Sequence, residues 1–138
     1  MSATLESVRP QLDWACDALI PRDDALGMPA ATPAGVVDTL LPRALKARDD
    51  LLHPFVAAMS TLPAEPPTDP LGTLYAMEED SFELITHIIA GAYYLSEEVN
   101  RTLKYPGQEA LRDQPDYDEL DAVVTRVRDR GTVYIPTP

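Results

Sequence analysis

The chain has 138 residues, which suffice for one domain with a modest core and leave little room for separate cofactor and substrate domains. A hydrophobic fraction of 45% predicts a folded chain, and 14 prolines against 6 glycines predict many helix starts and rigid connections. The formal net charge of −12 is spread along the chain without a basic run, which argues against binding to nucleic acid or to an anionic membrane by charge.

No segment reaches the roughly 20 apolar residues of a membrane span. The N-terminal stretch MSATLESVRPQLD has no basic start, apolar core or twin arginines. We therefore expect a soluble, cytoplasmic protein with no membrane insertion. Cys16 is the single cysteine, which excludes an intramolecular disulfide and a thiolate metal site. Its apolar neighbours indicate a small buried residue rather than a reactive thiol.

The first predicted helix begins at Pro10, which suits a first helical turn, and ends at Pro21. After a loop, Thr32-Pro33 resembles a second helix start, with a hydroxyl cap and proline at the first helical position. The apolar stripe of the first helix consists of Leu12, Cys16, Leu19 and Ile20.

Prolines are expected to divide the next part of the chain. Pro42 and Pro54 each remove a backbone donor and crowd a carbonyl, so the helical run to about residue 61 should form two or three pieces. The stretch PAEPPTDP favours a stiff, extended connection rather than a linker between domains. Asp69-Pro70 then repeats the cap and proline, which predicts a short helix through Met77 that ends or continues near Asp80.

The strongest helical pattern lies between Asp80 and Leu95, and such a helix should sit centrally among the others. Ser96 followed by acids predicts a new helix, which should stop before Tyr105 because that residue precedes a proline. The shared face of the central helix contains Phe82, Ile85, Ile88, Ile89, Ala92 and Tyr93.

A last helix is predicted from Asp118 to Asp129, closed by Gly131. Its apolar residues are Leu120, Val123, Val124 and Val127. Residues 132–138 are expected to form an extended tail. We therefore predict an all-α, compact single-domain bundle of about five to seven helices over residues 10–131.

The arrangement closest to a metal site is Glu79, Glu83 and His87, which share one side of the central helix at spacings of four. Carboxylate and histidine iron sites in helical bundles require a Glu-x-x-His pair on each of two helices, and the other histidine, His53, lacks that pattern. We interpret these residues as a solvated polar face and expect no metal site.

The sequence also indicates no catalytic centre of its own. It has no Gly-x-Ser-x-Gly elbow for a nucleophile, and neither GxGxxG nor GxxxxGK[ST] for nucleotide phosphates. Adjacent acids such as Glu97-Glu98 occur at helix starts, where capping and solvation explain them. We expect no catalytic residue and no cofactor in this chain, so a flavin would have to belong to a partner.

Several tyrosines are candidates for a contact surface, because tyrosine combines a stiff apolar body with a polar tip and is enriched at protein interfaces. Packing inside the chain is the competing interpretation, and it is favoured for Tyr93 and Tyr105. The two interpretations are balanced for Tyr94 and Tyr134, which lie off the main apolar face and in the tail.

Two blocks of sequence resemble the gluconate 2-dehydrogenase subunit 3 family, the small helical accessory subunits of flavin-dependent GMC-type dehydrogenases. The first block is LIPRDD followed by AGVVD at residues 34–38, similar to the family's IIPAD and AGVVDFID. The second is GAYY, the serine at 96, EV and LKYPG at residues 103–107, similar to G-x-Y-x-[SD]-P-x-V and L-G-Y-P-G. Together with the joining helices they cover residues 12–108.

This resemblance implies a non-catalytic subunit that binds a larger FAD-dependent GMC-type dehydrogenase and supports its folding, stability or export. The partner would carry the FAD and oxidise a sugar or another alcohol. The expected partner-binding residues lie in the tyrosine-rich turn and the tail. They are Tyr93, Tyr94, Tyr105, Pro106, Gly107, Gln108 and Tyr134.

Two other functions are compatible with the sequence. One is a stand-alone helical domain that binds or converts a small molecule, which an apolar pocket reached by His87 or Tyr94 would favour. The other is a self-associating structural module, whose symmetric dimer would cover its own apolar patch.

Overall fold

The computed structural model describes residues 4–108 and 116–133. Contacts between Cα atoms group the chain into two compact units, Met1–Pro106 and Gly107–Pro138. The predicted domain of residues 10–131 crosses the boundary between these units, and its extent stays a prediction. Most of the predicted tail, residues 134–138, lies outside the described residues.

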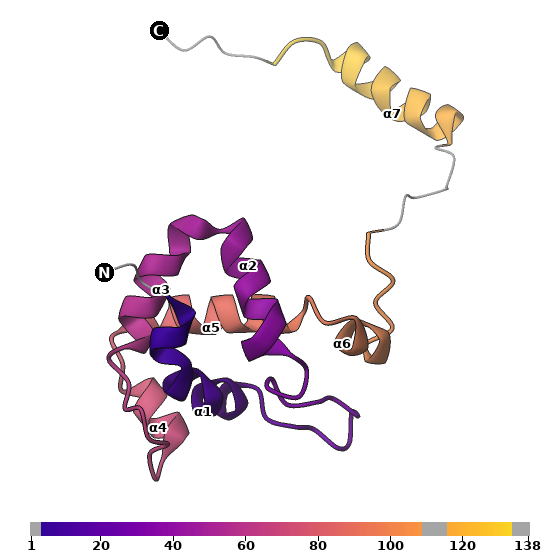
Figure 1. Cartoon of the computed structure of the whole chain (residues 1–138). Coiled ribbons are helices and arrows are strands. Elements are labelled where there is room, and N and C mark those ends of the chain that lie inside the picture. Colours follow the sequence, from indigo (N-terminus) through magenta and orange to yellow (C-terminus); the bar gives the residue numbers. More distant parts are fainter. Residues whose placement is uncertain (1–3, 109–115, 134–138) are drawn as a thin grey trace, which may run out of the picture. The chain divides into compact units, whose positions relative to one another are not determined.

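Every named element of the described residues is helical, which confirms the predicted all-α fold. An isolated antiparallel bridge between Asp23 and Met28 is the one extended pairing found in those residues. Short 3₁₀ or π-helical turns precede or join the longer helices: η1 (Leu5–Val8), η2 (Val36–Leu40) and η3 (Asp49–Leu51). The α-helices of the first unit (Figure 1) are α1 (Arg9–Leu19), α2 (Leu41–Ala47), α3 (Leu52–Met59), α4 (Pro70–Tyr75), α5 (Glu79–Tyr93) and α6 (Glu97–Thr102).

Helix α5 organises the core of the first unit, as its sequence pattern predicts. It contacts α2, α3 and η2, while α1 contacts α4 and η2. Ile85, Ile89 and Ala92 are fully buried on its inner face, and Phe82 and Ile88 are partly buried beside them. The face that repeats at about 100° per residue is therefore the face that packs.

Prolines divide the middle of the chain as expected. Pro42 lies in the first turn of α2, directly after the π-helical turn η2, and Pro54 lies in the first turn of α3, directly after η3. Each proline thus occupies a position where the missing N–H has no intrahelical carbonyl to bind.

Side-chain caps begin three helices, and two of them, at Asp69 and Ser96, are the caps that the sequence predicts. The Asp69 carboxylate accepts a hydrogen bond from the Gly72 amide at 2.9 Å, and the Ser96 hydroxyl accepts one from the Val99 amide at 3.4 Å. The Glu78 carboxylate accepts from the Ser81 amide at 3.0 Å, so α5 begins one residue before Asp80. These caps satisfy amides that the helices themselves leave free.

The helix start predicted at Thr32-Pro33 is wrong. Residues 31–35 form turns, and the helical segment begins at Val36 after Gly35, whose φ of 84° is left-handed. Glycine adopts this backbone readily, and it interrupts the helix that the cap-and-proline pattern predicts. The Thr32 hydroxyl is buried without a hydrogen-bond partner, and the Thr32 amide instead donates to the Asp17 carboxylate of α1 at 2.7 Å.

Two side chains of α1 hold the stiff proline-rich connection against the core. The Gln11 amide donates to the Leu62 carbonyl at 3.3 Å, and the Trp14 indole donates to the Pro63 carbonyl at 3.1 Å. Because the proline-rich backbone has few donors of its own, its carbonyls are free to accept these bonds.

The hydroxyl of Tyr93 at the end of α5 donates to the Pro29 carbonyl at 2.7 Å. Tyr93 is only 3% exposed, and the two residues are 64 apart in sequence. This bond ties the long central helix to the loop between α1 and η2.

The second unit contains α7 (Tyr117–Arg130). Its Asp116 cap accepts from the amides of Asp118 and Glu119, and Gly131 ends it with a positive φ of 75°. The predicted helix from Asp118 to Asp129 is therefore confirmed with one more residue at each end. Within residues 4–108 and 116–133, none of the helices combines the length and the hydrophobicity that spanning a membrane requires.

Replacing Tyr93 by phenylalanine should lower the free energy of unfolding by about 1 kcal/mol, because the Pro29 carbonyl loses its donor while the ring still packs. Urea denaturation followed by circular dichroism measures this change. Tyr94→Phe is the matched control, since its ring is exposed. Equal stability of the two variants would show that the bond to Pro29 does not hold the loop.

Candidate functional site

The segment from Tyr94 to Tyr105, which contains the connection after α5, helix α6 and the turn that follows it, places four large apolar side chains at the surface. We call them the exposed corner: Tyr94, Leu95, Leu103 and Tyr105, which are 57%, 39%, 49% and 56% exposed. Tyr94 directly follows the last residue of α5, Ser96 caps α6, and α6 itself spans only Glu97–Thr102. All four lie within twelve consecutive residues, and apolar side chains gathered at one place on a surface are candidates for a contact surface.

Asn100 of α6 fastens both ends of this corner. Its side-chain amide donates to the Tyr94 carbonyl at 3.0 Å, and its backbone carbonyl accepts from the Tyr105 amide at 2.9 Å. A helix as short as α6 is unstable alone, so these bonds and the buried Val99 side chain maintain it. Tyr94 and Tyr105 are therefore presented by backbone that is fixed before any partner binds.

The turn after α6 depends on a left-handed residue. Lys104 has a φ of 55°, and it is the one residue other than glycine with a positive φ in the described part of the chain. This conformation is uncommon for a residue that carries a side chain. It directs the backbone so that the Tyr105 amide reaches Asn100.

The structure separates the predicted partner-binding residues into distinct environments. Tyr94, Tyr105, Pro106 and Gln108 are exposed, and Gly107 is half-buried. Tyr93 is buried, so it positions the corner and offers little surface of its own. Tyr134 lies outside the described residues. Leu95 and Leu103 were not among the residues predicted to bind a partner. Their positions next to the tyrosine pair and to the Tyr-Pro-Gly turn could have indicated them.

Beneath the corner, the buried Tyr93 ring meets the Tyr94 ring edge-on, with centroids 5.8 Å apart and an interplanar angle of 72°. Burial raises the pKa of the Tyr93 phenol, and the nearby Tyr94 and Glu98 raise it further. The phenol therefore stays protonated and able to donate to Pro29. A small hollow of about 180 Å³ lies beside this bond, lined by Arg22, Asp24, Gly27, Met28, Pro29 and Glu98.

A second hollow of about 330 Å³ lies along α5. Three apolar side chains form part of its wall, and its charged or polar residues are all exposed. Glu79, Glu83 and His87 are exposed as expected for a solvated polar face. In the described ranges, no group of three or more His, Cys, Asp or Glu side chains could hold a metal ion. The hollow is lined by Arg48, Leu51, Asp80, Glu83, Leu84, His87 and Ile88.

Cys16 is not a nucleophile in this fold. Its side chain is fully buried in α1, and burial raises the pKa of the thiol to about 12, with the charges of Asp17 and Asp13 adding to the rise. A thiol with this pKa is protonated at neutral pH, and only the thiolate attacks. The structure therefore assigns Cys16 to the core, as the sequence predicts.

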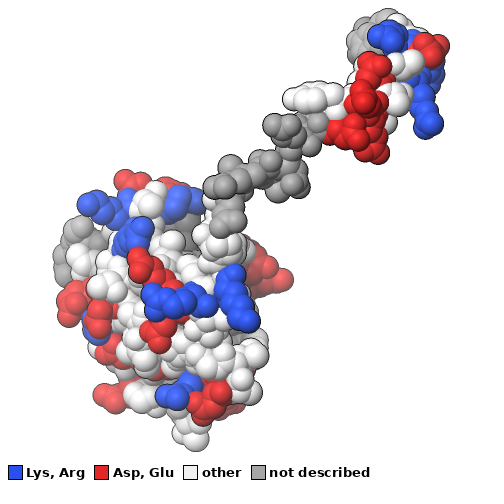
Figure 2. Space-filling view, turned by 90° about the vertical axis from the view of Figure 1, so that its right-hand side faces the viewer, with Lys and Arg blue, Asp and Glu red and all other residues white. Residues whose placement is uncertain are grey.

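The face of the first unit seen in Figure 2 carries acidic and basic side chains interspersed among uncharged ones. The unit's charged residues include Arg9, which bridges the Asp13 and Asp38 carboxylates at 2.8 and 2.7 Å. Such exposed pairs contribute little to stability.

The raised pKa of Cys16 predicts a loss of stability at alkaline pH. Below the ordinary thiol pKa of 9.0 the thiol is neutral in both states; above it the unfolded chain ionises while the folded chain stays protonated up to about 12. Relative to Cys16→Ala, the free energy of unfolding of the natural chain should fall by up to about 1.4 kcal/mol per pH unit in this window. Urea titrations from pH 8 upward measure the difference. Parallel pH profiles for the two proteins would contradict the burial argument.

Lys104→Gly should raise the free energy of unfolding by about 0.5–1 kcal/mol, because glycine adopts the left-handed backbone without strain. Arg101→Gly is the matched control: Arg101 lies within α6, where glycine should be destabilising by a similar amount. Thermal or urea unfolding compares the two. A loss of stability in both variants would show that Lys104 is not strained in the turn.

No protein-family model matches this chain, and neither a curated protein nor a solved structure matches it.

Proposed function

We propose that this chain is a non-catalytic small subunit that binds a larger FAD-dependent dehydrogenase of the GMC type and supports its folding or stability. The observation that carries the proposal is the exposed corner. Four large apolar side chains project from backbone that Asn100 holds in place. Rigid aromatic residues that need no reordering are the kind of group that dominates binding at protein interfaces.

The two blocks of sequence that resemble the accessory-subunit family meet in the first unit. The Pro29 carbonyl, between the two parts of the first block, accepts from Tyr93 of the second block at 2.7 Å. Glu98 of the second block and Asp24 of the first both line the small hollow beside that bond. The two blocks are far apart in sequence but adjacent in the structure. We therefore expect both to contribute to the same function, the binding of the larger subunit.

The left-handed backbone of Lys104 also supports the proposal. Lys104 occupies the position where the family's L-G-Y-P-G segment has its first glycine. A positive φ of 55° is the conformation that favours glycine. A glycine would adopt this backbone readily, so the conformation at Lys104 supports the resemblance although the residue differs.

In the proposed complex, the larger subunit would carry out the whole reaction. The larger subunit would hold FAD and oxidise a sugar or another alcohol, and this chain would cover an apolar face of that subunit. A stable interface buries roughly 800 Å² on each partner. The exposed corner would form its apolar centre, with the surrounding polar residues of α6 as its rim.

A stand-alone small-molecule-binding domain is the second candidate, and the hollow of about 330 Å³ beside His87 favours it. Its volume is at the lower end of the range for ligand pockets. Saturable binding of a small molecule that His87→Ala abolishes, without any effect of the flavoprotein, would favour this candidate over the accessory subunit.

The double variant Tyr94→Ser, Tyr105→Ser should weaken binding to an FAD-dependent GMC-type dehydrogenase of the same organism by at least about tenfold, because it removes two aromatic anchors. Co-purification and calorimetric titration measure the loss. Tyr75→Ser is the matched control: Tyr75 is 69% exposed on α4, which lies away from α6 (Figure 1).

The proposal fails if the double variant binds as the natural chain does. It also fails if the dehydrogenase folds, retains FAD and turns over normally when it is produced without this chain. Unchanged circular dichroism of the free variant would exclude unfolding as the cause of any loss of binding.

A further inference from the structure

Helix α7 of the second unit carries an apolar stripe that is open to solvent. Its four members are between 48% and 55% exposed, and at about 100° per residue they lie on one side of the helix. A single helix of 14 residues is marginally stable in water, so covering this stripe would stabilise it. The stripe consists of Leu120, Val123, Val124 and Val127.

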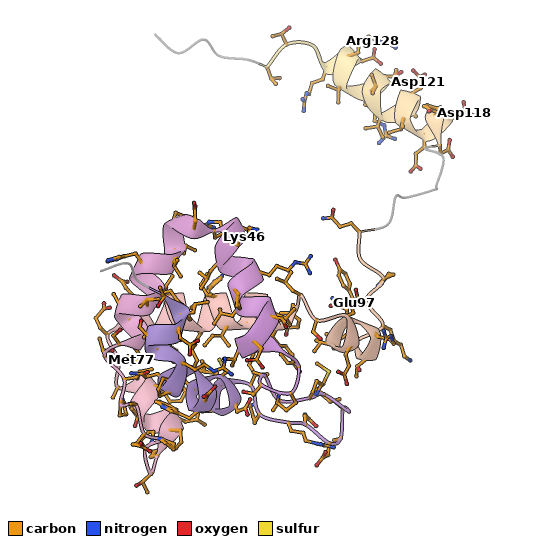
Figure 3. The ribbon with its side chains drawn as sticks, viewed as in Figure 1. Lys46, Met77, Glu97, Asp118, Asp121 and Arg128 are labelled. Atoms are coloured by element: carbon orange, nitrogen blue, oxygen red, sulfur yellow. The ribbon has the colours of Figure 1, made fainter. Side chains whose placement is uncertain are left out.

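The charges of α7 are divided along its length. Three acids lie in its N-terminal half and three arginines in its C-terminal half, where Asp129 is the one acid. Figure 3 shows Asp118 and Asp121 toward one end and Arg128 toward the other, and in Figure 2 most of the acidic side chains of this helix gather apart from the basic ones. The acids are Asp118, Glu119 and Asp121, and the arginines are Arg126, Arg128 and Arg130.

The helix dipole explains only part of this division. It favours acids in the first turn and bases in the last, and its effect falls off beyond those turns. Asp121 and Arg126 lie outside them. The dipole also gives no reason for an exposed apolar stripe between the charged flanks.

We propose that two copies of the chain associate through α7, with the two helices antiparallel and their apolar stripes in contact. On a helical wheel, Asp121 and Arg128 flank the stripe on one side, and Glu119 and Arg130 flank it on the other. Each flank therefore has an acid in its first half and a base in its second.

Antiparallel pairing makes these flanks complementary. When Leu120 faces Val127 of the second copy, Asp121 lies close to Arg128 of that copy, and the two-fold axis repeats the pair. Glu119 and Arg130 of the second copy approach each other at the other flank. A parallel pair would instead place acid beside acid and base beside base, which is unfavourable.

The size of α7 predicts weak, reversible association. Fourteen residues give a helix about 21 Å long, and a pair of such helices covers less surface than a standard stable interface. The monomer and dimer should therefore exchange, and their ratio should depend on concentration and on salt.

Charge reversals in the full-length chain test the proposal by sedimentation equilibrium in low salt up to about 1 mM. Asp121→Arg or Arg128→Asp alone should weaken self-association about tenfold, because each places like charges together at two symmetric positions. The double variant Asp121→Arg, Arg128→Asp should recover it. An equimolar mixture of the two single variants should also associate, since the introduced arginine and the natural Arg128 of one variant would face two aspartates of the other.

Several results would overturn the proposal. They are a natural chain that stays monomeric over this range, single reversals that associate as the natural chain does, and a double variant that does not recover. Reversals that alter binding to a flavoprotein while self-association is absent would assign α7 to that partner instead. None of these measurements of self-association includes the dehydrogenase, so they are independent of the accessory-subunit proposal.

Discussion

The hydrogen bond from the Tyr93 hydroxyl to the Pro29 carbonyl, 2.7 Å long, connects the two parts of the first unit that the proposed function needs. Tyr93 is the last residue of the central helix α5, and its ring is buried with the core. Because the ring cannot rotate away without exposing apolar surface, the position of its hydroxyl is fixed by packing. The loop before η2 and the start of the exposed corner are thereby held to the same rigid element.

The exposed corner begins at the residue after Tyr93 and is held by local hydrogen bonds. Tyr94 leaves the helix, Ser96 begins α6, and Asn100 bonds back to Tyr94 and forward to Tyr105. The left-handed Lys104 closes the turn. These bonds order the backbone that carries the exposed side chains before a partner binds, which lowers the entropic cost of binding one.

Much of the fold could be predicted because its signals are local. The period of α5, the caps at Asp69 and Ser96 and the prolines in α2 and α3 each depend on a few neighbouring residues. The start at Thr32-Pro33 was mispredicted because a distant side chain, Asp17, binds the Thr32 amide and Gly35 then turns the backbone. Propensity gives no indication of such a tertiary contact.

The candidate site was predictable only in part. The helical period places Tyr93 on the apolar face, and the packing favoured for it is confirmed, since Tyr93 is buried. The packing favoured for Tyr105 is wrong, since Tyr105 is 56% exposed, and the period left Tyr94 open between packing and contact. Burial depends on which helices pack beside the segment. The apolar stripe of α7 is a second example. Its spacing is typical of a helix that packs on a core, yet its side chains are exposed within the second unit.

Hydrogen exchange of the backbone amides of residues 94–105, measured with and without the FAD-dependent dehydrogenase, tests the central claim most directly. Burial of the exposed corner should slow exchange in this segment at least about tenfold, while the amides of α4 are unchanged. Unchanged exchange at residues 94–105 in the presence of saturating dehydrogenase would contradict the account, because the corner would then remain open to solvent.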